Sequence, residues 1–424
     1  MNIYYILILE NSEIIRHGFT LGCFSFLLVI FIFKKPQVKL NLALFYSFLW
    51  TSFSLAILNY TCIYYNLWEF FSKESLFIGI PLDIYFIWII CWSIIPVYFF
   101  EGKHALIIAL IFLWLDIICM PYLENFRILK LGDNWLLGEF AMIAIVFLPS
   151  YLWAKCSIED KHLAWRVRLQ VLTMSFIFIL IVPFLLFTYQ SKTFVLANNP
   201  IIIQFAFIIV LPSLIAVKDL YSLGKGSPFP LDPTKKLVRI GVYAYIKNPI
   251  QWSFTLLFIP LSILYKEPLL LIGVPISIAY TIGVSNPQEN SNMTHRYGKQ
   301  WTIYTKNVPK WYFLWKPVAI PQGTIYFKQD CNECQALKQW FIKHKGINLI
   351  IKHAHEHPKN IQQITYTDYL GNNHSSVVAM AHAFEHINVI WASLGWLMCL
   401  PPITYLVQTI VDAIGFGPLE DCEL

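Results

Sequence analysis

The hydrophobic positions of this chain gather in long runs that are separated by short polar loops. Many of these runs are long enough to cross a lipid bilayer, which takes roughly 20 residues. The pattern predicts about nine membrane-spanning helices, and because the first and eighth runs are short, the count allows for one span more or fewer. The runs lie near Phe19–Phe33, Leu40–Tyr64, Leu76–Phe100, His104–Leu123, Trp135–Ala154, Leu169–Tyr189, Ile201–Val217, Ile250–Leu264 and Leu269–Val284.

The pattern changes after about residue 318, where hydrophobic runs become short. TIYF, INLIIKH and ITYTDY alternate like strands, while CNECQALKQWFIKHK and SSVVAMAHAFEHI have helical spacing. Two further apolar runs of about 12 residues are too short to span and predict a covering pair of helices. We expect a mainly α protein with three regions: a transmembrane bundle (1–190), a second membrane region (191–318) and a small α/β domain (319–424).

Composition agrees with a membrane protein, since 57% of the 424 residues are hydrophobic and 13% are charged. A soluble chain carries about twice that charged fraction. Lys and Arg are more frequent in the loops on one side of the predicted spans, which predicts an outer N-terminus and a cytoplasmic C-terminus. No basic cluster lies on a soluble module with interleaved aromatics, so we expect no nucleic-acid partner. The first residues, MNIYYILILENSE, do not have the pattern of a cleavable signal peptide.

Two polar stretches bracket the last pair of hydrophobic runs and carry the most informative motifs. The first is Gly224–Pro249, GKGSPFPLDPTKKLVRIGVYAYIKNP, and the second is Glu289–Trp311, ENSNMTHRYGKQWTIYTKNVPKW. Together they resemble the integral-membrane methyltransferases of the isoprenylcysteine carboxyl methyltransferase and phospholipid methyltransferase group. The matching positions are Leu237, Val238, Gly241, Tyr243, Tyr245, Asn248, Pro249, Glu289, Met293, Tyr297, Gly298, Trp301, Tyr304, Val308 and Pro309.

This resemblance implies S-adenosyl-L-methionine as the methyl donor and a membrane lipid or isoprenoid as the acceptor. It implies that Glu289 binds the donor's amino group, and that Lys247 or Arg296 meets a carboxylate as part of the catalytic site. Asn248 would supply an amide, and Gly241 would let the backbone approach the donor. Other donor-binding positions implied by the family pattern are Tyr243, Tyr245, Pro249, Tyr297, Gly298, Trp301 and Tyr304.

Each of these positions also has a purely structural interpretation. Gly241 is compatible with a turn, Asn248 and Pro249 with a helix N-cap followed by a first-turn proline, and Arg296 with an interfacial anchor. The aromatic residues are compatible with an interfacial belt. The chain also departs from the family pattern at two positions, Val242 in place of Pro and Lys247 in place of Arg. An altered or degenerate enzyme is therefore an alternative.

A CxxC motif, Cys331 and Cys334, lies where the strand TIYF gives way to a helix. A helix N-terminus lowers the pKa of a thiol, which is why redox pairs occur at such junctions. The whole tail resembles the DCC family of thiol–disulfide oxidoreductases, which implies a thioredoxin-like domain and a cytosolic dithiol partner. A half zinc site completed by histidines of the segment 353–357 is the alternative.

Three acidic residues, Asp83, Asp116 and Glu139, fall inside predicted spans, where charge is costly. Their common depth predicts one intramembrane polar cluster. Its functional interpretation is a cavity for a head group or a proton-coupled step, and the structural interpretation is a set of helix–helix hydrogen bonds. A transporter-like role of the first five spans remains a further alternative.

Taken together, the sequence predicts a multi-pass protein of a bacterial-type inner (cytoplasmic) membrane. Its expected activity is S-adenosylmethionine-dependent methylation of a lipid or isoprenoid acceptor, with a thiol–disulfide redox domain attached. The competing hypothesis is a membrane-anchored thiol–disulfide oxidoreductase or scaffold whose methyltransferase core is degenerate.

Overall fold

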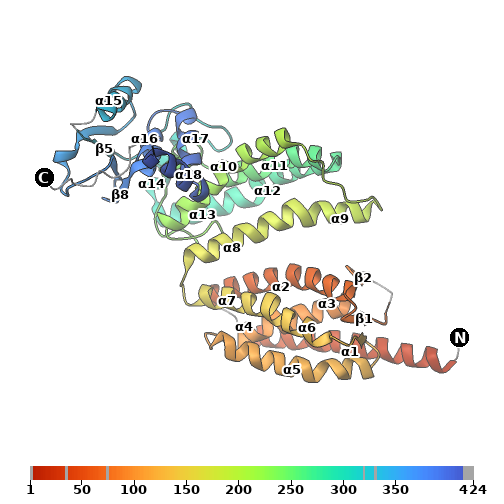
Figure 1. The fold of residues 1–424 in the computed structure, drawn as a ribbon. Helices are drawn as coiled ribbons and strands as arrows, with labels where there is room; N and C mark the ends of the chain where they lie inside the picture. The colour runs from red at the N-terminus through yellow and green to blue at the C-terminus, as the bar shows by residue number, and fades with distance from the viewer. Residues whose placement is uncertain (1–2, 34–36, 73–75, 319, 329–331, 414–424) are drawn as a thin grey trace. The chain divides into compact units, whose positions relative to one another are not determined.

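The computed structural model describes residues 3–33, 37–72, 76–318, 320–328 and 332–413 (Figure 1). The chain divides into two compact units. The N-terminal unit comprises Met1–Leu180 together with the short segment Phe229–Pro233, and the C-terminal unit comprises Ile181–Pro228 and Thr234–Leu424.

Eight helices of the described residues are long and apolar enough to cross a membrane, and the chain is a multi-pass membrane protein. The predicted eighth span is a shorter apolar helix, α11 (Pro249–Leu264). A pair of helices bent by 90°, α17 (Val389–Met398) and α18 (Pro401–Val411), would make nine candidates if it formed one span. The eight helices are Glu13–Ile32, Val38–Tyr64, Leu82–Phe99, Ala105–Asn125, Trp135–Ile158, Leu163–Tyr189, Pro200–Ser222 and Pro268–Tyr297.

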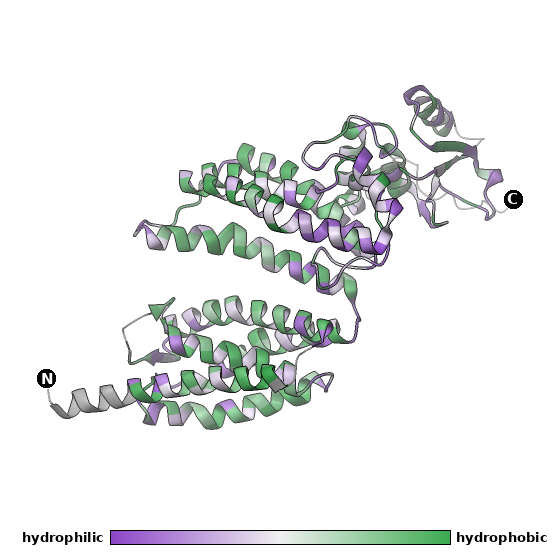
Figure 2. Ribbon diagram, turned by 180° about the vertical axis from the view of Figure 1, so that it is seen from behind, coloured by the Kyte–Doolittle hydropathy of each residue, from purple (hydrophilic) through white to green (hydrophobic). Residues whose placement is uncertain are grey.

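The N-terminal unit is a helical bundle with two small β ribbons at its loops. Its helices are mostly hydrophobic, as Figure 2 shows in green, and they enclose one large apolar core. β1 pairs with β4 and β2 pairs with β3, both antiparallel. The elements are α1 (Ile3–Phe33), α2 (Val38–Tyr64), β1 (Trp68–Phe70), β2 (Leu76–Phe77), β3 (Ile80–Pro81), α3 (Leu82–Ile89), α4 (Ile95–Phe99), α5 (Ala105–Asn125), β4 (Leu129–Leu131), α6 (Trp135–Ala141), α7 (Leu148–Ile158) and α8 (Leu163–Phe176).

The membrane helices of the C-terminal unit frame the two motif stretches. Between α10 and α11 the first stretch forms a loop with a 3-10 turn at Gly241–Ala244. The last span continues beyond its predicted end at residue 284 as far as Tyr297, so it carries the start of the second stretch. The elements are α9 (Val182–Tyr189), α10 (Pro200–Ser222), α11 (Pro249–Leu264), α12 (Gly273–Tyr280), α13 (Asn286–Tyr297) and α14 (Lys299–Asn307).

The remainder of the C-terminal unit is a four-stranded mixed sheet with helices, and Figure 2 shows more purple, hydrophilic residues there than in the bundles. The strand order is β6-β5-β7-β8, in which β5 and β6 are parallel and the other pairs are antiparallel. Three strands match the sequence prediction, whereas β8 was not predicted. The elements are β5 (Gly323–Phe327), α15 (Asn332–His344), β6 (Leu349–His353), β7 (Thr365–Thr367), β8 (Asn373–Ser375), α16 (Ser376–Phe384), α17 (Val389–Met398) and α18 (Pro401–Val411).

The C-terminal helices pack directly against the first motif stretch. One buried cluster joins Leu211 and Ile215 of α10, Tyr245 of the loop, and Trp396 of α17. The Tyr245 ring meets the Trp396 ring edge to face at 5.7 Å. The motif loop therefore has a wall that comes from a part of the chain about 150 residues later.

Candidate functional site

The two motif stretches lie side by side in the C-terminal unit and are joined by hydrogen bonds. The Tyr304 hydroxyl donates to the Tyr243 carbonyl at 2.9 Å, and the Lys247 amide donates to the Pro309 carbonyl at 2.8 Å. The Tyr297 hydroxyl donates to the Thr234 carbonyl at 2.6 Å. These contacts bring α13 and α14 onto the loop that precedes α11, so the two stretches that carry the family motifs meet in space.

Lys247 is the charged centre of this junction, and its side chain is 1% exposed. Its Nζ lies 3.6 Å from Glu289 Oε2 and 3.3 Å from Asn290 Oδ1, and 4.6 Å from the centroid of the Trp301 ring. Burial lowers the pKa of Lys247, and the negative charge of Glu289 opposes that shift. The ammonium thus sits between a carboxylate and an aromatic face, where a cation is favoured.

Glu289 keeps hydrogen-bonding capacity despite this ion pair. The distance of 3.6 Å is too long for a hydrogen bond, and Oε2 is buried without a hydrogen-bond partner. A buried carboxylate oxygen in that state is costly unless a donor group approaches it. Glu289 therefore presents an acceptor for an ammonium or a hydroxyl group.

Asn248 occupies the residue before α11, but its side chain makes no capping bond. Its Nδ2 instead donates to Gln251 Oε1 at 2.8 Å and to Asn286 Oδ1 at 3.4 Å. Gln251 in turn donates to the Ser285 hydroxyl. These polar side chains connect the start of α11 to the start of α13, so the capping interpretation of Asn248 is wrong for its side chain.

Gly241 has a positive φ of 59°, and its surroundings explain why no side chain is present. A Cβ at this position would lie 2.4 Å from Asp219 Oδ2 and 3.6 Å from Glu385 Oε1. Asp219 comes from α10 and is 6% exposed, and its Oδ2 has no hydrogen-bond partner. The backbone at Gly241 thus approaches the carboxylate of Asp219 closely. The sequence motifs did not single out Asp219, although it lies only five residues before Gly224.

The four aromatic candidates are interior residues, which overturns their interpretation as a lipid-facing belt. Tyr243, Tyr245, Trp301 and Tyr304 are at most 9% exposed. Burial raises the pKa values of Tyr243 and Tyr304 well above the ordinary range. The neutral Tyr304 hydroxyl donates to the Tyr243 carbonyl, and the buried rings provide packing surfaces.

The remaining motif residues mark the edges of the junction. Pro249 is buried as the first residue of α11. Arg296 is exposed at the end of α13 and donates to the Thr234 carbonyl. Gly298 ends α13 with a φ of 51° and has open space around it. Arg296 and Gly298 are therefore at the surface of the junction, while Lys247 and Glu289 lie within it.

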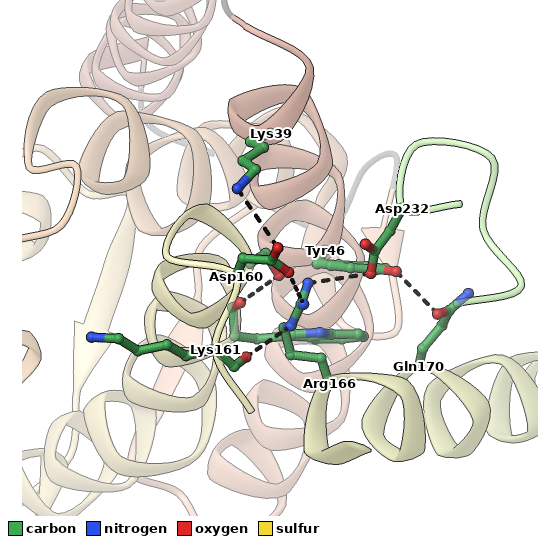
Figure 3. A network of polar contacts seen from close by, with 9 residues as sticks. Lys39, Tyr46, Asp160, Lys161, Arg166, Gln170 and Asp232 are labelled. Carbon is green, nitrogen blue, oxygen red and sulfur yellow. Dashed lines mark hydrogen bonds and ion pairs between the residues drawn. The ribbon is translucent and has the colours of Figure 1, made fainter. Parts of the chain in front are cut away.

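The segment Phe229–Pro233 of the first stretch belongs to the N-terminal unit, and Figure 3 shows Asp232 of this segment in a polar network. Arg166, which is 1% exposed, donates to Asp160 at 3.0 Å and to Asp232 at 3.3 Å. The Phe229 ring stacks on the Phe45 ring at 4.7 Å. A buried guanidinium and a stacked aromatic pair therefore fix the segment Phe229–Pro233 in place.

The other predicted residues fall outside this junction. Asp116 and Glu139 lie together at a small cavity of the N-terminal unit, whereas Asp83 is paired with Arg16 at 2.8 Å. The cavity therefore brings together two of the three predicted acids, Asp116 and Glu139. Cys331 lies outside the described residues, and Cys334 is buried in the first turn of α15.

The junction fits the donor that the motifs imply. S-adenosylmethionine carries an ammonium, a carboxylate and ribose hydroxyls, and each needs a partner of opposite or complementary character. The unpartnered buried oxygens of Glu289 and Asp219 suit the donor's N–H and O–H groups, and the Lys247 ammonium suits its carboxylate. The residues present are thus of the kinds required.

Comparison with known proteins finds a match to one protein family. Residues 200–300 match the family model described as phospholipid methyltransferase (PEMT), a range that takes in the first motif stretch and all of α13. No curated protein and no solved structure matches the chain. The comparisons give no support to a DCC-family or thioredoxin domain in residues 319–424. Over residues 200–300, this multi-pass membrane protein is thus similar to the phospholipid methyltransferase family.

Proposed function

We propose that this protein is an integral-membrane, S-adenosylmethionine-dependent methyltransferase that acts on a lipid or isoprenoid-type acceptor. The observation that carries the proposal is the junction at Lys247 and Glu289, where two stretches separated by a helical hairpin meet. The family match implies methyl transfer, and the neighbouring apolar helices support a reaction beside lipid.

The reaction requires little covalent chemistry from the protein's own side chains. When bound, S-adenosylmethionine supplies an activated methyl group, which the acceptor takes by in-line displacement. The protein's task is to hold two partners in line and to exclude water. The buried side chains of Lys247 and Trp301 and the half-buried Glu289 suit this task, because they form a polar contact whose groups already face one another.

Individual roles follow from the chemistry of each side chain. Glu289 would accept from the donor's ammonium or ribose hydroxyls, and Lys247 would meet its carboxylate. Asn248, held by Gln251 and Asn286, would orient a polar group of the donor. We also assign Asp219 to the donor-binding residues, because its unpartnered oxygen lies beside Gly241.

The location of the site is part of the proposal. The distribution of Lys and Arg among the loops favours a cytoplasmic C-terminus and an outer N-terminus in a bacterial-type inner membrane. The soluble donor would then enter from the cytosol and the acceptor from the bilayer. Labelling of a single introduced cysteine in the loop 224–240 with a membrane-impermeant reagent tests this orientation.

Donor binding is the direct test of the site. Calorimetry of the purified protein in detergent should show binding of S-adenosylmethionine or of its demethylated product. Glu289→Gln should weaken that binding at least about tenfold, because a charged hydrogen bond is worth about 1.5–3 kcal/mol. Glu101→Gln, the same change at an exposed loop residue, is the control and should bind normally. Absence of binding at millimolar donor would rule out the proposal.

A second activity, thiol–disulfide exchange by the C-terminal sheet region, is favoured by one observation. Cys334 lies in the first turn of α15, directly after β5 and within a unit whose strands β5 and β6 are parallel. This is the kind of strand-to-helix junction where redox cysteines occur. A thiol titration at defined redox potential tests it, and two thiols that never form a disulfide would reject it.

A further inference from the structure

The N-terminal unit contains a small cavity in which two acidic side chains meet a group of tryptophans. Asp116 comes from α5 and Glu139 from α6, and Trp68, Trp88 and Trp92 also line the space, together with leucine and methionine side chains. All of these residues belong to Met1–Leu180, so no residue of the methyltransferase domain takes part. The cavity has room for about one water-sized group.

The two carboxyl groups line the same cavity, and one oxygen of Glu139 is buried without a hydrogen-bond partner. Glu139 is 1% exposed and its Oε1 accepts no hydrogen bond. Among the residues that the structure describes, no basic side chain pairs with either acid. Leaving a carboxylate oxygen unsatisfied at this depth is expensive, and acids kept inside a membrane bundle normally serve a ligand.

The walls of the cavity narrow the choice of ligand. Apart from the two acids, the lining consists of aromatic, leucine and methionine side chains, so it offers no hydroxyl or amide oxygen. A metal cation such as sodium would lack most of the oxygen ligands that hard cations require. Tryptophan faces attract organic cations and ammonium groups instead.

Trp68, which packs on the residue before Glu139, is held rigidly. Trp68 Nε1 donates to Asn59 Oδ1 at 2.8 Å. Its ring presses on the backbone of Gly138, where an added Cβ would lie 2.2 Å from Cζ3. Because Gly138 directly precedes Glu139, this packing fixes the carboxylate and the aromatic wall together, and such preorganisation favours binding.

We propose that this cavity binds the ammonium ion, which is about the size of a water molecule. The N–H groups donate to Glu139 Oε1 and Asp116, and the tryptophans cover the remaining charge. The size of the space excludes ethanolamine and quaternary ammonium groups. The inference stands independently of methyl transfer, since it rests on the N-terminal unit alone.

Calorimetry of the full-length protein in detergent tests this proposal with ammonium chloride, ethanolamine hydrochloride, sodium chloride and tetramethylammonium chloride at equal ionic strength. Saturable binding is expected for ammonium, and none for ethanolamine, sodium or tetramethylammonium.

Single substitutions in the cavity test whether ammonium binds there. Glu139→Gln should weaken ammonium binding at least tenfold, and Trp92→Leu severalfold, while the exposed control Glu101→Gln leaves it unchanged. Trp92→Leu keeps the test decisive if Glu139→Gln fails to fold. The proposal is overturned if ammonium gives no saturable heat, if sodium binds equally well, or if folded variants at positions 139 and 92 bind ammonium like the wild type.

Discussion

At the scale of single residues, Gly241 illustrates what sequence patterns reveal and what they leave out. The motif marks it as a position without a side chain, and the structure supplies the reason, because Asp219 and Glu385 fill the space where a Cβ would lie. The motif named the glycine correctly but not its partner. Glu385 comes from a segment 144 residues later, and no local pattern links the two positions.

Gly241→Ala should destabilise the C-terminal unit and abolish donor binding, because it combines a positive φ with a 2.4 Å contact to Asp219. Gly371→Ala is the matched control, since its φ is 83° but its surroundings are open. Backbone strain alone costs about 1–2 kcal/mol there. Thermal unfolding in detergent compares the two variants, and Asp219→Ala should partly rescue Gly241→Ala. Equal losses in the two glycine variants would contradict the steric explanation.

His374 gives the C-terminal unit a pH dependence. Burial, and then the neighbouring His382, lower the pKa of His374 from 6.5 to about 4. Since the unfolded chain binds the proton more readily, this contribution to stability is complete above pH 6.5 and is lost as the pH falls towards 4. Unfolding measured across this window should show a smaller pH slope in His374→Gln. An unchanged slope would contradict the assignment.

At the scale of elements, hydropathy predicts most of the membrane helices because apolar runs and bilayer thickness set their length. It does not predict that the last span continues to Tyr297, since the residues of α13 are polar. Strands of two or three residues, such as β1, β4 and β8, were also missed because they are too short to show an alternating pattern. The carboxylate at Glu289 is therefore placed by a helix that the sequence pattern ends too early.

The polar network around Arg166 secures one such element, the segment Phe229–Pro233 (Figure 3). Arg166→Met should lower the stability of the N-terminal unit by about 1.5–3 kcal/mol, because charged hydrogen bonds to Asp160 and Asp232 are lost. Arg168→Met, an exposed neighbour on the same helix, serves as the control. Thermal unfolding of both variants in detergent decides the matter, and a fully stable Arg166→Met protein would refute the role of the network.

At the scale of the whole molecule, the methyltransferase-family match covers residues 200–300, but the walls of the candidate site extend beyond it. Trp301 and Tyr304 follow directly, and Tyr245 donates its hydroxyl to the carbonyl of Glu385 at 2.8 Å. The C-terminal region is thus part of the structure that supports the motif loop. The sequence predicts a boundary at residue 318 because composition changes there. Composition carries no information on such long-range packing.

Trp396→Ala should therefore impair donor binding although residue 396 lies outside the family match. Trp396 is 1% exposed and packs on Tyr245, and removing a buried tryptophan costs about 3–5 kcal/mol. Leu394→Ala on the same helix removes a side chain that is 41% exposed and should have little effect. Calorimetric donor binding and thermal unfolding compare the two variants. Normal binding by Trp396→Ala would mean that the C-terminal helices do not support the site.

The most direct test is methyl transfer itself, with purified protein in lipid vesicles and S-adenosylmethionine labelled in its methyl group. The wild-type protein should move the label into the extracted lipid fraction, Glu101→Gln should do the same, and Glu289→Gln should lose the transfer. Label that never enters the lipid fraction, across vesicles of amine lipids and of isoprenoid acceptors, would contradict the assignment of a lipid methyltransferase.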